Sequence, residues 1–273
     1  MVILSISSQV AMGHVGNAAT AYALRRLGHE VWDVPTIILS HHPGHGKPAA
    51  LRTPPDTVRQ MIASLRSRAE PDAVFSGYLA DAENADIVAE TVADLGATVP
   101  FILDPVLGDS HTGLYVAPEI ADAVASRLVP LASVMLPNRF ELAHLSGRNV
   151  DLIGDCREAA LSLVEKGPKA VICTSSPADT GMVAAQLVTR DGCWRVQMPL
   201  IPEAPHGTGD LFAGVFMARW LDGAPMQEAM GYAAGAVHAV VGWSQAMRSG
   251  DLALVAGQAA LNEPPVLPEI EKL

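Results

Sequence analysis

Short apolar runs that alternate with helical segments constrain the fold of this chain more than any other feature. Runs typical of buried strands occupy residues 2–7, 31–34, 73–76, 99–103, 133–136 and 170–173. Segments with helical periodicity lie between or after them, at 17–27, 56–68, 81–95, 118–128 and 155–166. This alternation predicts βαβ units, and therefore an α/β three-layer sandwich with a mainly parallel central sheet and helices on both faces.

The last third of the chain departs from the alternation. Residues 181–188 and 194–198 predict a hairpin, and the weakly charged segments 207–221 and 225–241 predict helices at the centre of the molecule. Residues 40–55 are rich in His, Gly and Pro and predict a loop, called the flap below. Because no repeat or linker interrupts the chain, we expect one domain over residues 1–273.

Composition and charge exclude several classes of protein. With 49% hydrophobic and 17% charged residues, the chain has a globular composition. A net charge of −11 argues against a nucleic-acid binder and against a protein that basic residues hold on a membrane. Cys156, Cys173 and Cys193 show no metal or disulfide spacing and predict free thiols in a reducing compartment. With no basic leader and no unbroken apolar span, we expect a cytoplasmic protein outside the membrane.

The segment Gly207-Thr208-Gly209-Asp210, at the start of an apolar helix, is the most informative motif. Glycines at a helix start let backbone N–H groups converge on one point, with the positive end of the helix dipole behind them. Such a cradle suits a phosphoryl group in transfer, and Asp210 could accept the proton of an attacking hydroxyl. The alternative is that Asp210 only caps the helix. The Walker A and dinucleotide-binding patterns are incomplete, so a P-loop ATPase and a Rossmann dehydrogenase are not expected.

Acidic residues also follow two predicted strands. Asn138 and Glu141 have the spacing of a capping box. Glu141 could equally order Mg²⁺-bound water near a triphosphate, and the two roles are compatible. Asp104 ends a buried strand, where it either faces a ligand or terminates the strand in a turn.

Aromatic and histidine residues leave further alternatives open. Tyr78 could stack on an aromatic ligand or pack in the core. His41, His42 and His45 lie in the flap, and we favour a mobile substrate loop over a metal site.

Several motifs together resemble one known family, the pyridoxal kinases of the ribokinase-like superfamily. The family shares IQSHVxxGHVGNxAA, which resembles the N-terminal LSISSQVAMGHVGNAA. It also shares RLGxxVWxxxTVQFSNHTxYGK, which resembles RRLGHEVWDVPTIILSHHPGHGK. The motifs SGYL, DPVLGD, PNRFEL and GTGDLF follow in the family's order. The resemblance covers nearly the whole chain and implies a ribokinase-like fold and ATP-dependent phosphorylation of the 5′-hydroxyl of pyridoxal, or of pyridoxine or pyridoxamine, in vitamin B6 salvage.

The resemblance also implies roles for individual residues. Asp210 matches the catalytic base, and an anion hole is matched by the amides of Gly207, Thr208 and Gly209. Substrate positions are matched by Ser8, Val15, Thr36, Tyr78 and, in the flap, Pro43 and Gly44. Positions near ATP are matched by Asp104, Asn138, Glu141, Thr174 and Ser175, with Asp104 and Glu141 holding Mg²⁺ through water. Family members use Mg·ATP, are often helped by a monovalent cation such as K⁺, and are dimers.

The chain departs from the family pattern mainly on the substrate side, at Gln9, His41, Pro43 and His45, and also at Thr174. These departures leave the phosphotransfer motifs intact and leave the preferred vitamer open. One alternative is a hydroxymethylpyrimidine, sugar or nucleoside kinase of the same superfamily, against which the N-terminal and flap motifs argue. The other is a non-catalytic regulator that binds a vitamer or nucleotide, against which the intact GTGD motif argues.

Overall fold

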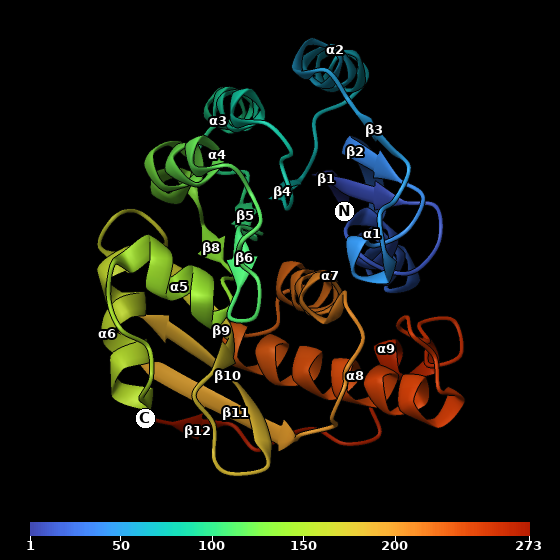
Figure 1. Ribbon diagram of the computed structural model, residues 1–273. Coiled ribbons are helices and arrows are strands. Elements are labelled where there is room, and N and C mark those ends of the chain that lie inside the picture. The colour runs from blue at the N-terminus through green and yellow to red at the C-terminus, as the bar shows by residue number, and fades with distance from the viewer.

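The computed structural model describes residues 1–273, and its centre is a ten-stranded sheet (Figure 1). The strand order is β12-β11-β10-β9-β8-β5-β4-β1-β2-β3. The strands are β1 Val2–Val10, β2 Glu30–Leu39, β3 Ala50–Arg52, β4 Ala73–Ser76, β5 Phe101–Leu103, β8 Val134–Met135, β9 Ala170–Ser176, β10 Met182–Thr189, β11 Cys193–Pro199 and β12 Glu271–Lys272. All pairings between β2 and β9 are parallel, and antiparallel strands close both edges. The predicted mainly parallel sheet and the β10–β11 hairpin are confirmed.

Helices cover both faces of the sheet (Figure 1). On one face lie α2 Pro55–Arg66, α3 Ala82–Leu95, α4 Pro118–Ala123, α5 Arg139–Ser146 and α6 Ile153–Val164. On the other lie α1 Asn17–Arg26, α7 Thr208–Leu221, α8 Met226–Met247 and α9 Ala259–Asn262. The two hydrophobic cores contain 35 and 31 buried residues, so the sheet is buried on both sides and its strands read as continuous apolar runs. None of the helices combines the length and the apolar composition that crossing a bilayer requires.

Several element boundaries differ from the sequence predictions, and three of these differences lie in the first half of the chain. The predicted cap of α2 at Asp56 is wrong, because Pro54 is the N-cap and Pro55 begins the helix, where its missing N–H costs nothing. The predicted helix 118–128 is α4 followed by a π-helical turn, Val124–Leu128. The flap contains a 3₁₀ turn, Pro43–His45, and strand β3, which pairs with β2.

The sheet changes its direction of winding at β1. From β1 the chain adds β2 and β3 on one side, and β4 and the following strands on the other. At such a switch point the connections after β1 and β4 run in opposite directions, and ligands bind at the carboxyl ends of these strands. The residues that follow β1 and β4 are therefore placed to form a site.

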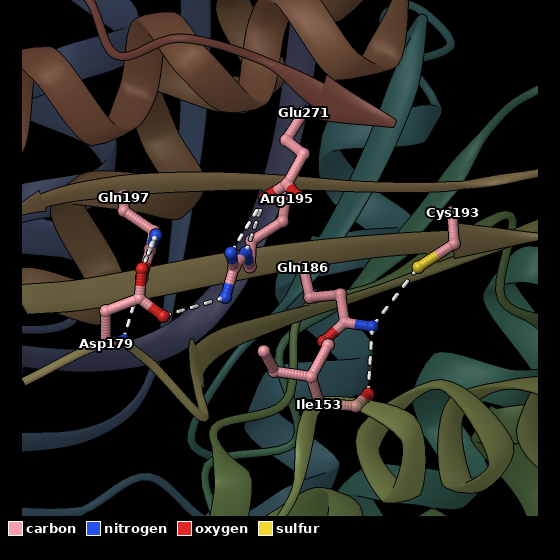
Figure 2. Close-up of polar contacts among 7 residues, drawn as sticks. All are labelled: Ile153, Asp179, Gln186, Cys193, Arg195, Gln197 and Glu271. Carbon is pink, nitrogen blue, oxygen red and sulfur yellow. Dashed lines mark hydrogen bonds and ion pairs between the residues drawn. The ribbon is translucent and has the colours of Figure 1, made fainter. Parts of the chain in front are cut away.

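The opposite edge of the sheet is held by a buried arginine. On β11, Arg195 is 7% exposed, and its Nη2 donates to Oε2 of Glu271 on β12 at 2.8 Å. Its Nη1 lies 3.5 Å from Oδ1 of Asp179, whose Oδ2 accepts from Nε2 of Gln197 at 2.9 Å (Figure 2). β12, distant from β11 in sequence, thereby pairs with Trp194 and Arg195 at the outer edge of that strand.

Candidate active site

The start of α7 is built on a glycine that no other residue could replace without strain. Gly207 is the N-cap with φ of 96°, and a Cβ there would lie 2.0 Å from the carbonyl oxygen of His14. No side chain caps this helix end, and the first amides of a helix have no carbonyl partner within it. The backbone N–H groups of Thr208 and Gly209 therefore belong to a helix start that can hold an anion.

Asp210 is the third residue of α7, so the alternative that it caps the helix is wrong. The N–H of Gly16 donates to its carboxylate, and the hydroxyl of Thr20 donates to its backbone oxygen at 3.0 Å. Burial raises the pKa of Asp210 to about 6, although the Gly16 N–H acts in the opposite direction. A half-buried carboxylate with this pKa can accept a proton near neutral pH.

Glu141 and Asn138 form the predicted capping box at the start of α5. Oε2 of the buried Glu141 accepts from the Asn138 N–H at 2.9 Å, and Oε1 accepts from the Leu107 N–H at 2.8 Å. Burial raises the pKa of Glu141 to about 7, against the effect of these N–H donors. The Asn138 side chain also donates to the carbonyl oxygen of Gly108 at 2.8 Å, which fixes the segment after β5 to α5.

Asp104 lies directly after β5 and is buried. Its pKa is well above the ordinary value because of burial, and then because of the negative charges of Glu141 and Asp210. The structure therefore brings together three carboxylates that the sequence separates widely. Their mutual repulsion favours a bound cation or a proton at this place.

The sequence patterns did not identify two further residues of this region. Desolvation, and then the negative charges of Glu141, Asp104 and Asp210, raise the pKa of Tyr115, although 45% of this residue is exposed. Asp109 accepts from the N–H groups of His111 and Thr112 in the hairpin formed by β6 Gly108–Asp109 and β7 Gly113–Leu114. Burial acts to raise the pKa of Asp109, but these hydrogen bonds leave it below the ordinary value. Asp109 is the last residue of the DPVLGD motif, and Tyr115 follows that motif without a signal of its own.

The predicted substrate residues lie where β1, β2 and β4 end. The buried Thr36 hydroxyl donates to the carbonyl oxygen of Tyr78 at 2.6 Å, and the Tyr78 N–H donates to Ser7 Oγ at 3.2 Å. Val15 is buried against Gly207, with its Cγ1 3.1 Å from where a Cβ of that glycine would stand. These contacts join the carboxyl ends of the three strands to the start of α7.

Ser8 is joined to the same loop through the backbone. A Cβ at Gly16 would lie 2.5 Å from the Ser8 carbonyl oxygen, so only glycine, here with φ of 56°, lets the two segments meet. The Gly16 N–H also acts on the Asp210 carboxylate, since it lowers the pKa of that group.

Pro43 and Gly44 lie in the exposed 3₁₀ turn of the flap. The structure places this turn beside the start of α7, since a Cβ at Gly44 would lie 2.5 Å from Nε2 of His206. Thr174 and Ser175 lie inside β9, beyond its predicted end at residue 173. Ser175 Oγ accepts from the Arg139 N–H at 3.0 Å, which places it at the start of α5.

The donor set suits a cation that keeps most of its own water. No group of three or more His, Cys, Asp or Glu side chains is arranged to hold a metal ion. Mg²⁺ is typically held by one or two carboxylates together with substrate phosphates and water. Asp104 and Glu141, both buried and mutually repelling, fit that description.

Comparison with known proteins gives matches over the whole chain. The model of the phosphomethylpyrimidine kinase family matches residues 33–254. Pyridoxal kinase PdxY of Rubrobacter xylanophilus is 35% identical over 274 residues, which cover 97% of this chain and 94% of that protein. The pyridoxal kinase PdxY of Corynebacterium diphtheriae is 32% identical and is covered fully, as is this chain.

Solved structures agree with the sequence comparisons. The pyridoxal kinase of Leishmania donovani in complex with ADP and pyridoxine superposes with a TM-score of 0.93 at 26% identity, covering 100% of this chain and 99% of that one. Its complex with ADP and pyridoxamine gives the same TM-score at 27% identity and the same coverage. The predicted ribokinase-like fold is therefore confirmed.

Proposed function

The chain belongs to the phosphomethylpyrimidine kinase family and, by its curated relatives, to the pyridoxal kinases, and from that membership we propose that it transfers the γ-phosphoryl group of ATP to the 5′-hydroxyl of pyridoxal. Pyridoxine and pyridoxamine are the other vitamers to which the proposal extends. The observation that carries it is the position of Asp210. This carboxylate has a pKa raised to about 6 by burial, and it stands in the first turn of an uncapped helix at the switch point of the sheet.

In the proposed reaction, the oxygen of the 5′-hydroxyl attacks the γ-phosphorus while Asp210 accepts the proton of that hydroxyl. The amides of Gly207, Thr208 and Gly209 stabilise the charge on the transferring group, with the helix dipole of α7 behind them. Positioning and electrostatics of this kind account for most of the catalysis of phosphoryl transfer. The Gly16 N–H keeps the Asp210 carboxylate oriented.

Mg²⁺ would be held through water by Asp104 and Glu141, and when bound it would neutralise negative charge on the phosphates. Asn138 would fix Glu141 through the capping box, and Thr174 and Ser175 would face the nucleotide phosphates from β9. Support comes from the repulsion among the buried carboxylates, which a cation relieves.

The pyridine ring would lie among the ends of β1, β2 and β4, against Ser8, Val15, Thr36 and Tyr78. Pro43 and Gly44 would close over it from the flap. Support comes from the hydrogen bonds and close backbone approaches that join these segments to the start of α7. The vitamer preference would depend on the flap, where this chain departs from the family pattern.

We also propose a single kinase domain over residues 1–273 that acts in the cytoplasm as a homodimer, with K⁺ as a stimulating ion. The family resemblance supports the dimer and the ion, and three free, buried cysteines suit a reducing compartment. Sedimentation of the purified protein tests the dimer, and replacement of K⁺ by Na⁺ tests the ion.

The deciding experiment is incubation of the purified protein with Mg·ATP and pyridoxal while pyridoxal 5′-phosphate is followed by absorbance. Product formation that is lost in Asp210→Ala is expected. A parallel panel with hydroxymethylpyrimidine, sugars and nucleosides tests the alternative kinase activities. A faster reaction with one of these compounds would identify it, and not pyridoxal, as the substrate. Binding of vitamer or ATP without any product would favour the non-catalytic regulator.

A further inference from the structure

The 3₁₀ turn of the flap is closed by a neutral histidine. Nδ1 of His42 accepts a hydrogen bond from the Gly44 N–H at 3.0 Å. A protonated imidazole carries a hydrogen on both ring nitrogens and cannot accept this bond. The turn as seen therefore requires His42 without its second proton.

The same imidazole is stacked on a second histidine from a distant part of the chain. The rings of His42 and His206 lie 4.1 Å apart between centroids, inclined by 31°. His206 immediately precedes Gly207, the N-cap of α7. Gly44 packs into the same contact, since a Cβ there would lie 2.5 Å from Nε2 of His206. The flap is thus docked one residue before the proposed anion hole.

A third contact holds the turn from the other side. Nε2 of His45 lies 3.0 Å from Oδ1 of Asp251, in the loop after α8. Asp251 in turn packs against Gly13, where a Cβ would lie 2.7 Å from its Oδ1.

We propose that the stacked pair His42 and His206 is a proton-sensitive latch, which docks the flap beside the start of α7 while His42 is neutral and releases it when His42 is protonated. His206 is then a positioning residue for the flap. The proposal rests on the proposed function only for what the flap covers, because the docking itself concerns the chain alone.

The electrostatic surroundings of His42 oppose its protonation. Burial, and then the neighbouring His206 and His45, lower the pKa of His42 to about 4, while Asp251 acts in the opposite direction. These are the titratable groups that face it: His45 from its own turn, His206 from the segment before α7, and Asp251 from the loop after α8. Released from the stack, His42 would have the ordinary pKa of about 6.5.

The sign of the pH dependence follows from these two values. The docked flap binds fewer protons than the released flap, so docking is fully present above about pH 6.5 and weakens as the pH falls toward about 4. Between about pH 7.5 and about pH 5, the equilibrium should move toward release by about 30-fold.

Hydrogen–deuterium exchange of the protein without nucleotide or vitamer tests the latch. At each pH, the exchange rate of a peptide from the flap is divided by the intrinsic exchange rate, which gives its protection. A peptide from α8 serves as the reference. In the wild-type protein, the protection of the flap should fall about 30-fold between about pH 7.5 and about pH 5. His206→Ala should lower protection already at the higher pH.

Two further variants isolate the proton. His42→Asn keeps an oxygen that can accept from Gly44 but does not titrate, so its flap protection should be independent of pH. His41→Asn is the matched control, because His41 contacts Ser40 at the base of the flap and should leave the response unchanged. A pH-independent wild type, or a response that persists in His42→Asn, would overturn the latch. Inactivity toward pyridoxal would overturn the proposed function and leave this result intact.

Discussion

The two sides of the candidate site are held in opposite ways. On the phosphate side, Asp104 and Glu141 are buried, and backbone N–H groups bind both oxygens of Glu141. On the substrate side, the flap is mostly exposed and its turn contacts the rest of the molecule through the side chains of His42 and His45. Buried, fully bonded polar groups hold one geometry, whereas an exposed loop with few contacts opens at little cost. The comparison teaches that the carboxylates Asp104 and Glu141 are held rigidly, whereas the flap, which we propose covers the substrate, is left adjustable.

The largest effect is expected at the rigid side, from Asp210→Ala. Removal of the proposed base should lower kcat by about 10²–10⁴-fold, the usual contribution of proton transfer in catalysis. ATP binding should change little, because the phosphates are held by other groups. Steady-state kinetics and a nucleotide titration measure the two quantities. Wild-type kcat in this variant would refute the role of Asp210.

The pH profile should separate the two sides. Asp210 must be unprotonated to act, and burial raises its pKa to about 6, so kcat should fall about tenfold for each pH unit below that value. In His42→Asn the proposed latch no longer titrates, so the acid limb that remains in kcat should be that of Asp210. Rates at saturating substrate over about pH 4.5–8 measure this. A flat profile would count against the assignment.

Substitutions at two glycines separate the stability cost of backbone strain from that of close packing. Gly28 has φ of 94° and nothing near its Cβ position, whereas Gly207 has φ of 96° and the His14 carbonyl oxygen at 2.0 Å. Gly28→Ala should cost about 1–2 kcal/mol of the free energy of unfolding, from the left-handed backbone alone. Gly207→Ala should cost about 1–3 kcal/mol more, because the segment that contains His14 must also move away from the start of α7. Denaturant unfolding measures both, and equal losses would contradict the close contact.

Glu141→Gln should act through the metal ion and the cap together. Its matched control is Asp155→Asn, because Asp155 accepts from the Leu152 N–H at 3.0 Å at the start of α6, away from the site. Asp155→Asn should change the free energy of unfolding little, because its amide oxygen can still accept from the Leu152 N–H. Glu141→Gln should lose about 1–3 kcal/mol, because only one of the two N–H donors that Glu141 binds keeps an acceptor. Only Glu141→Gln should raise the Mg²⁺ concentration needed for half-maximal activity. An unchanged Mg²⁺ titration would limit Glu141 to its capping role.

The smallest effect is expected in the flap. Leu51 on β3 is 65% exposed, so Leu51→Ser should change the free energy of unfolding by less than about 0.5 kcal/mol. Thermal unfolding measures this. A large loss would show that the flap supports the fold and would break the contrast between the two sides.

Local signals were sufficient where neighbouring residues decide the structure. β4 has its predicted bounds, because its four residues form one buried run that Gly77 follows directly. The spacing of Asn138 and Glu141 predicted the capping box, since both partners lie in one helical turn. Strand lengths were less accurate. β9 continues to Ser176 because Ala184 of β10 pairs with Ser176, a partner that the local sequence does not reveal.

Contacts between distant segments could not be predicted from local patterns. Tyr115 lies near the carboxylates only because the β6–β7 hairpin folds back, and no local signal marks it as part of a site. The stack of His42 on His206 depends on the path of two separate loops. The residues of β12 pair with β11 without any strand pattern of their own. The motif resemblance supplied the candidate site residues, which periodicity could not, and their roles stay predictions.

The position of β12 has a consequence for how the chain folds. Until that segment arrives, 76 residues after Arg195, β11 is an edge strand with unpaired N–H and C=O groups. Such edges pair with other chains and start aggregation, and an inward-pointing charge is one of the devices that prevent it. A charge at such an edge disfavours pairing with a foreign strand. In the finished sheet the same guanidinium binds Glu271, so that Trp194 and Arg195 pair with this chain's own segment.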